Sequence, residues 1–527
     1  MKIVSGRVMA EIDRTAIEER GIPSLALMER AGWSVAREFH RLCRNPSTPV
    51  VILCGRGNNG GDGWVAARHL QGWGYRPRVI VTHPPESLSP DSRANWERYR
   101  GTPFACWEVW EGASSKGAKW FSDSPVVIDS LLGTGATGAP KEPYSELIRF
   151  SEERAKWTLG VDIPSGVEAD TGDSPGESVT CRSTVTFGLP KKGHFLGAGL
   201  DRTGALAVAD IGFPKDLLQN AESEAELIAP AWAAKTLPRY PRSTHKGVRG
   251  KTLILAGSPG LLGAAILAAR ACLAAGSGLV TLGIPASLNA PVKAAVPEAM
   301  TLPLPETSDG SIARAALARI LEHSSGADAV AIGPGLGSHP ETQEVVVECL
   351  AKCDRPMALD ADGLNALAAR GAQAVLRERR GPTVLTPHPG EVARMLGVDK
   401  RAVVEDPRVH VERASEQANA IVVLKGPTSF ICSGDGHLYL NHYPNDGMAT
   451  AGSGDVLAGM IGGIVGQQKI DPKDAVCLAV YVHSLAGDLA SRRLGHRAMT
   501  AVDIISHLGD SFLELRKWRE RLDPVLV

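Results

Sequence analysis

The hydrophobic and polar positions of the first 220 residues follow two alternating periodicities. Apolar residues three and four positions apart predict helices at 10–19, 24–42 and 64–73. Short apolar runs predict strands at 50–54, 78–82, 126–129, 158–162 and 183–188. Strands that alternate with helices form βαβ units, which build a parallel sheet covered by helices. We therefore expect the first part of the chain to be a Rossmann-like αβα sandwich.

The pattern fades after Pro214, and the stretch 219–229 is acidic and rich in alanine. The same alternation then resumes, with a helix predicted at 263–275. Strands are predicted at 251–257, 279–282, 329–332, 357–360, 383–386 and 421–424. The sequence thus predicts an α/β protein with a first domain at 1–220, a linker at 221–240 and a larger second domain at 241–527.

Composition places the chain among globular proteins with more than one domain. It has 527 residues, of which 43% are hydrophobic and 22% are charged. The formal net charge of −1 gives no overall attraction to nucleic acid or to anionic membranes, so neither is expected as a partner. The most apolar window, 261–282, contains Arg270 and predicts a buried helix and strand rather than a membrane span.

The start of the chain does not read as a signal peptide, and we expect a soluble cytoplasmic protein. Nine cysteines are scattered without a framework. Cys349 and Cys353 are spaced like a metal-binding pair, but no second pair of cysteines or histidines accompanies them. Two thiols one turn apart on a helix, in a reducing compartment, are the favoured interpretation.

The most informative motif lies at 450–463, where Gly452, Ser453 and Gly454 precede Asp455 and an apolar helix. The free N–H groups at a helix N-terminus form an anion site. A carboxylate in that site makes sense if it takes a proton from a hydroxyl while the amides stabilise the phosphoryl group that the hydroxyl attacks. Taken alone, the motif is equally compatible with an ordinary turn.

Three more loops of the second half follow predicted strands and carry polar or glycine-rich residues. The glycines of 333–337 let the backbone approach a ligand closely. Two flanking prolines fix the direction of His388, which by itself is more often a structural residue. Lys425 lies beside small hydroxyl residues, as suits phosphate oxygens. Together with the Asp455 motif, these loops indicate a phosphoryl-transfer site.

The first half has its own ligand loop at 55–63. It lacks both the spacing of a dinucleotide fingerprint and the Walker ending, which argues against a nucleoside triphosphatase. Asp129, Asp162 and Ser165 end or follow neighbouring predicted strands, so they can converge on one crevice. Their oxygens, with those of the loop asparagines, suit an alkali or alkaline-earth ion. Ordinary Asx and Ser turns are the alternative.

These motifs resemble those of the bifunctional NAD(P)H-hydrate repair enzymes. The match includes 27–32, 57–63, Asp129 before Gly133, and 161–166. In that family the first domain interconverts the R and S hydrates of NADH and NADPH. The resemblance implies that Asp162 is the acid–base group and that K⁺ is held by Asn59, Asp129 and Ser165. It also implies that the hydrate is contacted by Asn58, Asn59, Gly60, Gly61, Asp62, Gly133, Thr134, Gly135, Ala136, Thr137, Gly138, Ala139 and Asp162.

The second half is similar to the ribokinase-like superfamily, and within it to the ADP/ATP-dependent NAD(P)H-hydrate dehydratases. That resemblance implies hydrate contacts from Ala264, Gly335, His388 and the catalytic Asp455. It implies nucleotide contacts from Lys425, Gly426, Pro427, Thr428, Ser429 and Gly454, with Mg²⁺ on the phosphates. Pro427 stands where the family commonly has alanine, and proline has no N–H to donate.

We therefore predict a metabolite-repair enzyme whose substrates are the hydrates NADHX and NADPHX. The first domain epimerises them, and the second dehydrates the S form with ADP or ATP, releasing AMP or ADP and phosphate. A homo-oligomer is expected. One alternative is a ribokinase-like small-molecule kinase with a dinucleotide-sensing N-terminal domain. Another is a purely binding function for the first domain. The fused epimerase-like domain argues against the kinase, and Asp162 with the K⁺ ligands argues against a mere sensor.

Overall fold

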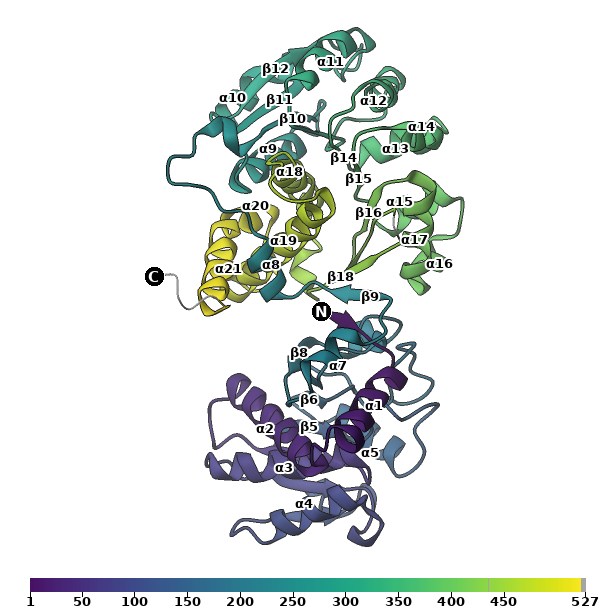
Figure 1. The fold of residues 1–527 in the computed structure, drawn as a ribbon, viewed down its shortest axis with the longest axis vertical. Helices are drawn as coiled ribbons and strands as arrows, with labels where there is room; N and C mark the ends of the chain where they lie inside the picture. The colour runs from purple at the N-terminus through teal and green to yellow at the C-terminus, as the bar shows by residue number, and fades with distance from the viewer. Residues whose placement is uncertain (435, 523–527) are drawn as a thin grey trace. The chain divides into compact units, whose positions relative to one another are not determined.

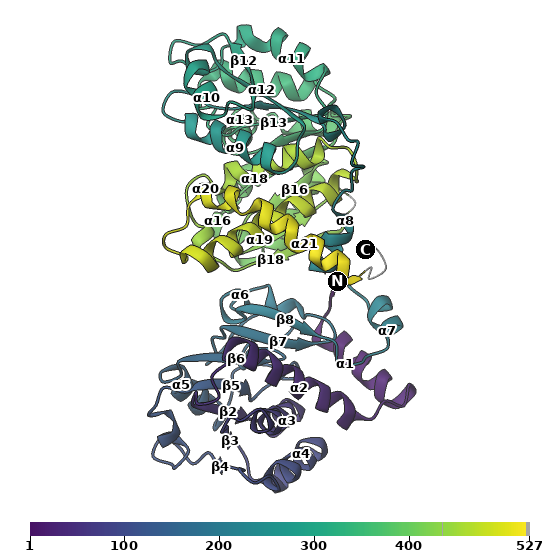
Figure 2. The ribbon, with the colours of Figure 1, turned by 90° about the vertical axis from the view of Figure 1, so that its left-hand side faces the viewer.

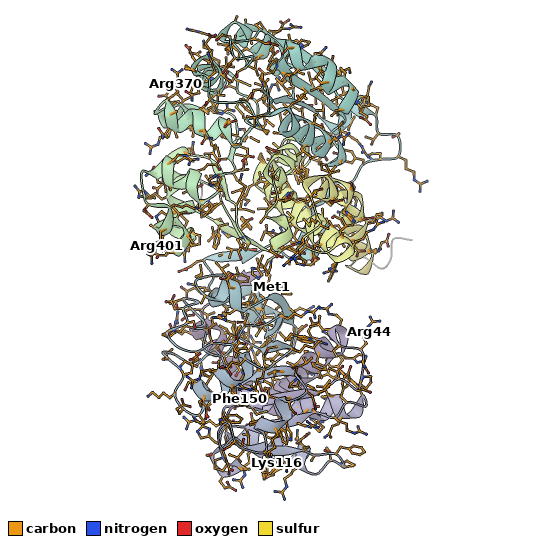
Figure 3. The ribbon with its side chains drawn as sticks, turned by 180° about the vertical axis from the view of Figure 1, so that it is seen from behind. Met1, Arg44, Lys116, Phe150, Arg370 and Arg401 are labelled. Atoms are coloured by element: carbon orange, nitrogen blue, oxygen red, sulfur yellow. The ribbon has the colours of Figure 1, made fainter. Side chains whose placement is uncertain are left out.

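The computed structural model describes residues 1–434 and 436–522. The chain divides into two compact units, Met1–Glu226 and Leu227–Val527, which we call the first and second units. Each is an α/β unit built around a largely parallel sheet, as the alternating periodicity predicts (Figure 1). Charged side chains such as those of Lys116, Arg370 and Arg401 point outward (Figure 3).

The first unit contains a seven-stranded sheet in the order β4-β3-β2-β5-β6-β7-β8, and all neighbouring strands are parallel. Leu53 lies opposite Asp129 in its register. The strands are β2 (Val50–Cys54), β3 (Arg78–Val81), β4 (Trp107–Val109), β5 (Val126–Ser130), β6 (Trp157–Val161), β7 (Ser183–Phe187) and β8 (Ala205–Ala209).

Helices cover both faces of this sheet because its strands are apolar on both sides. Val50 and Ile52 pack into a core with α2 (Ser24–Leu42) and α3 (Asn58–Gly72), which lie side by side (Figure 2). Val51 faces the opposite core, together with α5 (Tyr144–Glu152). The αβα sandwich is thus confirmed. The remaining helices are α1 (Gly6–Arg14), α4 (Pro90–Arg100), α6 (Gly199–Arg202) and α7 (Lys215–Asn220).

One boundary differs from the sequence prediction. The stretch 55–63 was expected to be a loop before a helix at 64–73, but α3 already begins at Asn58. The glycines there serve close packing instead of loop flexibility. A Cβ on Gly60 would lie 1.9 Å from the carbonyl oxygen of Gly55, and one on Gly63 would lie 2.1 Å from the Ser130 hydroxyl. Small residues therefore let α3 press against the ends of the strands.

The sheet of the second unit has the order β18-β17-β16-β15-β14-β13-β10-β11-β12. Strands from β12 to β16 are parallel, whereas β16, β17 and β18 pair antiparallel. The strands are β10 (Lys251–Leu255), β11 (Leu279–Pro285), β12 (Met300–Leu304), β13 (Ala329–Ile332), β14 (Met357–Leu359), β15 (Thr383–Leu385), β16 (Ile421–Leu424), β17 (Thr428–Cys432) and β18 (Leu438–His442).

Two helices made of small residues pack unusually closely in this unit, namely α9 (Leu262–Ala274) and α18 (Ser453–Val465). A Cβ on Gly459 would lie only 2.1 Å from the carbonyl oxygen of Ala268, so the backbones nearly touch there. Ala265, Ala268 and Cys272 are fully buried. The helix α9 therefore packs inside the unit, as the apolar window 261–282 predicted.

Further helices of the second unit surround this core. They are α8 (Pro230–Thr236), α10 (Asn289–Ala295), α11 (Leu317–Ser325), α12 (Pro340–Lys352), α13 (Asp362–Ala369), α14 (Gln373–Glu378), α15 (Pro389–Leu396), α16 (Lys400–Glu405), α17 (Pro407–Ala418), α19 (Pro472–Leu494), α20 (Ala501–Ser506) and α21 (Leu508–Leu522). Within the described residues, no helix combines the length and the apolar character that a membrane span requires.

The stretch 221–240, predicted as a linker, contains regular structure. It includes β9 (Ala225–Leu227) and α8. The short strand β1 (Lys2–Ile3) pairs antiparallel with β9, and Ile3 lies opposite Ala225. Alanine-rich and acidic composition alone therefore did not indicate an unstructured connection here.

Candidate functional sites

The candidate site of the first unit lies where its strand order reverses. β2 has β3 on one side and β5 on the other, so the loops after β2 and β5 diverge and leave a crevice. A cavity of about 510 Å³ occupies this point. The predicted residues that line it are Asn58, Asn59, Asp62, Gly133, Thr134, Gly135, Ala136 and Asp162, together with Asp13, Asp91 and Lys191.

The N-terminus of α3 supplies backbone donors at this cavity. Gly57 caps the helix with extended backbone and no side-chain hydrogen bond. Among the described residues, no acceptor pairs with the N–H groups of Asn58, Asn59 or Gly60. Free amides at the positive end of a helix dipole suit an anion such as a pyrophosphate. The arrangement fits a dinucleotide-like ligand.

Asp162 follows β6 in the left-handed backbone region, with φ of +65°. Its Oδ1 accepts hydrogen bonds from the Lys191 ammonium at 2.6 Å and from the Thr186 hydroxyl at 3.0 Å. Burial acts to raise the pKa of Asp162, but the neighbouring Lys191 outweighs it and holds that pKa below its ordinary value. This carboxylate is therefore ionised at neutral pH.

Asp62 has the opposite environment. Its residue is 8% exposed, and no donor among the described residues hydrogen-bonds its carboxyl group. Burial, with the negative charges of Asp162 and Asp13 nearby, raises the pKa of Asp62 well above its ordinary value. Burial also raises the pKa of Asp13, with Asp162 adding to the effect. The surroundings of the cavity thus favour the ionised form of Asp162 and the protonated form of Asp62.

The residues predicted to hold K⁺ come together beside the cavity. Ser165 donates to Asp129 from its hydroxyl at 2.7 Å and from its backbone N–H at 2.9 Å. Asn59 donates to the carbonyl oxygen of Leu132 at 2.9 Å. Burial raises the pKa of Asp129 to about 6. Among the described residues, the buried Asp129 carboxylate is hydrogen-bonded by the hydroxyl and amide of Ser165 and by the amide of Leu131, and no cationic side chain pairs with it. A buried carboxylate next to the oxygens of Ser165 and Leu132 fits a monovalent cation.

Other predicted residues of the first unit lie farther from the cavity. Gly60 and Gly61 are buried packing positions of α3. The last three residues of the second predicted loop, Thr137, Gly138 and Ala139, are exposed and do not line the cavity; the amide of Gly138 donates to Glu168 at 2.8 Å. Direct contact with a ligand is therefore better supported for 133–136 than for 137–139.

The second unit also has a strand-order reversal, with β10 between β13 and β11. The loop after β13 crosses close to the start of α9. Gly335 has φ of +63°, and a Cβ there would lie 2.6 Å from the carbonyl oxygen of Leu261 and 3.1 Å from the Cβ of Ala264. The structure thus brings together Gly335 and Ala264, two residues far apart in the sequence that were both predicted to contact the hydrate.

Asp455 lies in the first turn of α18. The helix is capped by Gly452 in the left-handed conformation, with φ of +89°. Among the described residues, no acceptor pairs with the N–H groups of Gly454 and Asp455. The buried His483 donates from Nε2 to the carbonyl oxygen of Ser453 at 3.0 Å, which steadies this turn. The opening motif is therefore a helix N-terminus with free amides.

Burial and neighbouring charges together shift the pKa of Asp455. Burial raises the pKa of Asp455 to about 6; Asp360 adds to the effect and Lys425 opposes it. Lys425 and Asp360 form an ion pair of 2.6 Å beside Gly454, where a Cβ would lie 3.5 Å from the lysine nitrogen. A cation, two carboxylates and free amides at one helix end can accept a proton and bind a phosphoryl group.

The loop residues between β16 and β17 differ in their exposure. Thr428 and Ser429 begin β17 and are buried, and the Thr428 hydroxyl lies 2.7 Å from Nδ1 of His442. Pro427 has no N–H, but its carbonyl oxygen accepts from the Tyr443 amide at 3.3 Å. Gly426 and Lys425 are less buried than the strand residues and so more open to a ligand.

His388 is the N-cap of α15. Its Nδ1 accepts from the amides of Gly390 at 3.0 Å and Glu391 at 3.3 Å, and the Glu391 carboxylate accepts from the His388 amide at 2.8 Å. Burial lowers the pKa of His388, and the ring is therefore neutral at pH 7. Because Nδ1 accepts, Nε2 carries the proton. His388 thus has a structural role, and its half-exposed ring places Nε2 3.5 Å from Oε1 of Glu391.

Comparison with known proteins identifies both units. Residues 24–193 match a family described as "YjeF-related protein N-terminus", and residues 252–509 match "NAD(P)H-hydrate dehydratase". The chain is 41% identical over 532 aligned residues to the bifunctional NAD(P)H-hydrate repair enzyme Nnr of Moorella thermoacetica, which covers all of this chain and 99% of that protein. This chain belongs to the bifunctional NAD(P)H-hydrate repair enzymes.

Other members of the repair-enzyme family are similar along most of their length. The Escherichia coli Nnr is 34% identical, with 94% of this chain and 91% of that protein covered. Among solved structures, the ADP/ATP-dependent NAD(P)H-hydrate dehydratase of Bacillus subtilis, crystallised with ATP and Mg²⁺, is 30% identical over 55% of this chain and 98% of its own, with a TM-score of 0.47.

Sequence reasoning missed several charged residues of this repair enzyme. Lys191 and Asp360 are buried against Asp162 and Lys425 respectively, yet neither was singled out. A usable signal exists for Asp360, because it ends a strand and is followed by a second aspartate, Asp362. A lysine after the strand at 183–188 is a weaker signal, since surface lysines also follow strands. The partners of both residues are distant in sequence.

Proposed function

We propose that this chain repairs hydrated NADH and NADPH in two steps. The first unit interconverts the R and S hydrates at the cavity that contains Asp162. The second unit removes water from the S form with ADP or ATP, at the N-terminus of α18. The observation that carries this proposal is the end-to-end match to a bifunctional repair enzyme, combined with an aspartate in a suitable setting in each unit.

Dehydration requires a better leaving group than hydroxide. Asp455 would take the proton of the substrate hydroxyl as that oxygen attacks the terminal phosphate of the nucleotide. The free amides of Gly454 and Asp455 would stabilise the developing phosphoryl charge, an effect of about 3–4 kcal/mol per donor in oxyanion holes. Phosphate would then leave with help from the ring nitrogen lone pair, giving a C=N bond. Loss of a proton from the neighbouring ring carbon to solvent would form the ring C=C bond, return the electron pair to nitrogen and give NADH or NADPH.

Nucleotide binding would rest on charge and backbone near Gly454. The ammonium of Lys425, paired with Asp360, lies close to Gly454, so it could reach a phosphate bound at the amide of that glycine. Gly426, Thr428 and Ser429 would contribute the remaining contacts, together with the carbonyl of Pro427. Mg²⁺ on the nucleotide phosphates would neutralise charge during transfer. Ala264, Gly335 and His388 would contact the hydrate from the opposite loops.

We also propose K⁺ as a resident ion of the first unit, held by Asn59, Asp129 and Ser165. Its role would be to neutralise Asp129 and to fix the loop that ends at Gly133, beside the cavity. Replacing K⁺ by Li⁺ at constant ionic strength should then slow epimerisation without slowing dehydration. An unchanged epimerisation rate in K⁺-free buffer would contradict this assignment.

The test of the function is a coupled assay with purified full-length protein, Mg²⁺ and either ADP or ATP. Both hydrate epimers should return to NADH, followed by the absorbance of the reduced nicotinamide. If only the S form were consumed after correction for spontaneous epimerisation, the epimerase assignment would fail. A phosphorylated product without NADH would instead indicate a small-molecule kinase of the same superfamily. Comparing the two nucleotides gives the donor preference.

A cytoplasmic location and a homo-oligomeric state are part of the same proposal. All nine cysteines are free thiols, as suits a reducing compartment. Large apolar side chains are exposed on helices, among them Trp33 on α2 and Leu513 on α21. Light scattering on the purified chain measures the oligomeric state directly, and a monomeric mass would refute this part.

A further inference from the structure

Lys191 is a buried cation whose donors are all occupied by the protein. It is 1% exposed, and its ammonium donates to Asp162 at 2.6 Å, to the Thr186 hydroxyl at 2.8 Å and to the Phe187 carbonyl oxygen at 3.3 Å. An ammonium group has three protons, so none remains for a ligand. Any influence of Lys191 on the reaction must therefore pass through the Asp162 carboxylate.

The same segment also holds the backbone of Asp162. His194 lies 2.9 Å by its Nε2 from the Asp162 carbonyl oxygen, while its Nδ1 accepts from the Lys191 amide at 3.1 Å. Because Nδ1 accepts, Nε2 carries the proton and donates. Asp162 has φ of +65°, a conformation that side chains other than glycine adopt at an energetic cost. Lys191 thus holds the carboxylate of Asp162, and His194 holds its backbone carbonyl group.

Among the described residues, no cationic side chain forms an ion pair with the other carboxyl groups of the cavity. Asp62 from α3, Asp13 from α1 and Asp91 from α4 line the same cavity as Asp162, and Lys191 is paired with Asp162. Asp62 is the most enclosed of these three, and no donor among the described residues reaches its carboxyl group. Two carboxyl groups whose surroundings favour opposite charge states are the arrangement found in acid–base pairs.

We propose that Lys191 is a positioning residue that fixes the Asp162 carboxylate as the proton acceptor of the epimerisation, and that Asp62 is the proton donor. This inference rests on the proposed epimerase function. It adds a division of labour between two carboxyl groups, which Lys191 sets through its ion pair with Asp162.

The chemistry balances with these two groups and water. The hydrate carries its hydroxyl on the carbon next to the ring nitrogen. Asp62 gives its proton to that oxygen, the C–O bond breaks with its electron pair going to oxygen, and the nitrogen lone pair forms a C=N bond. Water then adds to the opposite face and gives its proton to Asp162, while the C=N electrons return to nitrogen. Proton exchange with solvent restores both carboxyl groups.

The test compares two lysine variants of the full-length chain, Lys191→Met and Lys192→Met. Both remove one positive charge at neighbouring positions, but Lys192 pairs with Glu224 at 2.7 Å and does not line the cavity. The measurement is kcat/KM of epimerisation as a function of pH, with spontaneous epimerisation subtracted. Dehydration of the S hydrate in the same preparation reports the amount of intact second unit, and urea unfolding of each variant reports whether the first unit is folded.

Loss of the Lys191 cation should move the acidic limb of the profile to higher pH. Without the cation, burial disfavours the Asp162 carboxylate, so the active ionised form is lost at a higher pH as the solution is acidified. We expect at least a tenfold loss of kcat/KM at pH 7 in Lys191→Met and an unchanged profile in Lys192→Met. A uniform loss with an unshifted limb would reduce Lys191 to a structural residue and overturn the proposal.

A second pair of variants tests whether Asp62 is the proton donor. This test is informative even if Lys191→Met does not fold. Asp62→Asn keeps the shape of the side chain but lacks the proton, so epimerisation should fall at least 100-fold and the alkaline limb should disappear. Asp13→Asn should keep that limb. If Asp13→Asn removes the limb and Asp62→Asn does not, the donor assignment is wrong.

Different results would contradict the epimerase function and the role of Lys191. If the unaltered protein does not accelerate the interconversion of the hydrates, the proposed function itself falls. If it does, but the profiles of both lysine variants coincide, only the role of Lys191 falls.

Discussion

At the scale of single residues, Asp455 combines a proposed role as proton acceptor with a negative charge that its surroundings disfavour. The carboxyl is largely enclosed, its pKa is raised to about 6, and it lies beside the free amides of α18. A proton acceptor with a pKa near the working pH is efficient, because it is ionised at rest and still holds the proton that it takes.

Replacing Asp455 by Asn should abolish dehydration and spare epimerisation. The amide keeps the shape of the side chain but cannot accept the substrate proton, so the dehydration rate should fall at least 100-fold. The two activities are measured separately on the same folded preparation. Loss of both would refute the assignment of one reaction to each unit.

The same substitution should stabilise the fold at pH 7. The pKa of Asp455 in the folded chain is higher than in the unfolded chain, so the folded state favours the protonated form. The stability that this group contributes is present below the unfolded pKa and is lost as the pH rises through about 6. Asp455→Asn should therefore raise the denaturant midpoint of the second unit at pH 7, and the gain should vanish near pH 4. An equal gain at both pH values would contradict this.

Dehydration by the unaltered protein should have an acidic limb near pH 6. Below that pH the Asp455 carboxylate becomes protonated, and kcat/KM for the S hydrate should fall about tenfold per pH unit. The measurement is an initial-rate profile between pH 5 and 8, with the rate without enzyme subtracted. A flat profile down to pH 5 would show that Asp455 does not act as the base.

At the scale of elements, the N-terminus of α18 depends on one glycine. Gly452 has φ of +89°, and a Cβ there would lie 2.5 Å from Cδ1 of Leu267 on α9. The left-handed backbone therefore favours glycine at this position, and an added methyl group would also have to displace the end of the Leu267 side chain.

Gly452→Ala should destabilise the second unit and displace the free amides, lowering dehydration at least tenfold. The matched control is Gly397→Ala, where φ is +66° but nothing lies within 4 Å of the added Cβ. The control carries only the strain of the left-handed conformation, about 1–2 kcal/mol. Urea unfolding and dehydration rates of the two variants give the comparison. Equal effects would mean that contact with Leu267 is unimportant.

The elements also show where sequence patterns were sufficient. The strands that were predicted, together with the α9 and α18 helices, lie close to their observed positions, because periodicity reflects burial. The strands β4, β8, β12, β17 and β18 were not predicted. The start of α3 was placed too late, since a glycine-rich stretch reads as a loop. Glycines that serve close packing and glycines that serve turns look the same in one sequence, and only the neighbouring backbone distinguishes them.

At the scale of the whole molecule, we predict that the S hydrate passes between the two proposed reactions by diffusion through solution. A mixture of Asp162→Asn and Asp455→Asn chains should then convert the R hydrate to NADH. The first variant retains dehydration, the second retains epimerisation, and the S hydrate passes through solution. Coupled absorbance of the mixture against each variant alone is the measurement. If each variant shows its own activity but the mixture does not, the hydrate is transferred within one chain.

The sequence by itself determined the two α/β units, the family and the loops of each candidate site, because these depend on local periodicity and on motifs of adjacent residues. The confirmed family prediction rested on such motifs, as at 57–63 and 450–463. The roles of Lys191 and Asp360 needed the tertiary structure. Their partners lie 29 and 65 residues away, so their charges meet only after folding. Burial and these pairings, which together shift the pKa values of Asp162, Asp62 and Asp455, are properties of the folded chain alone.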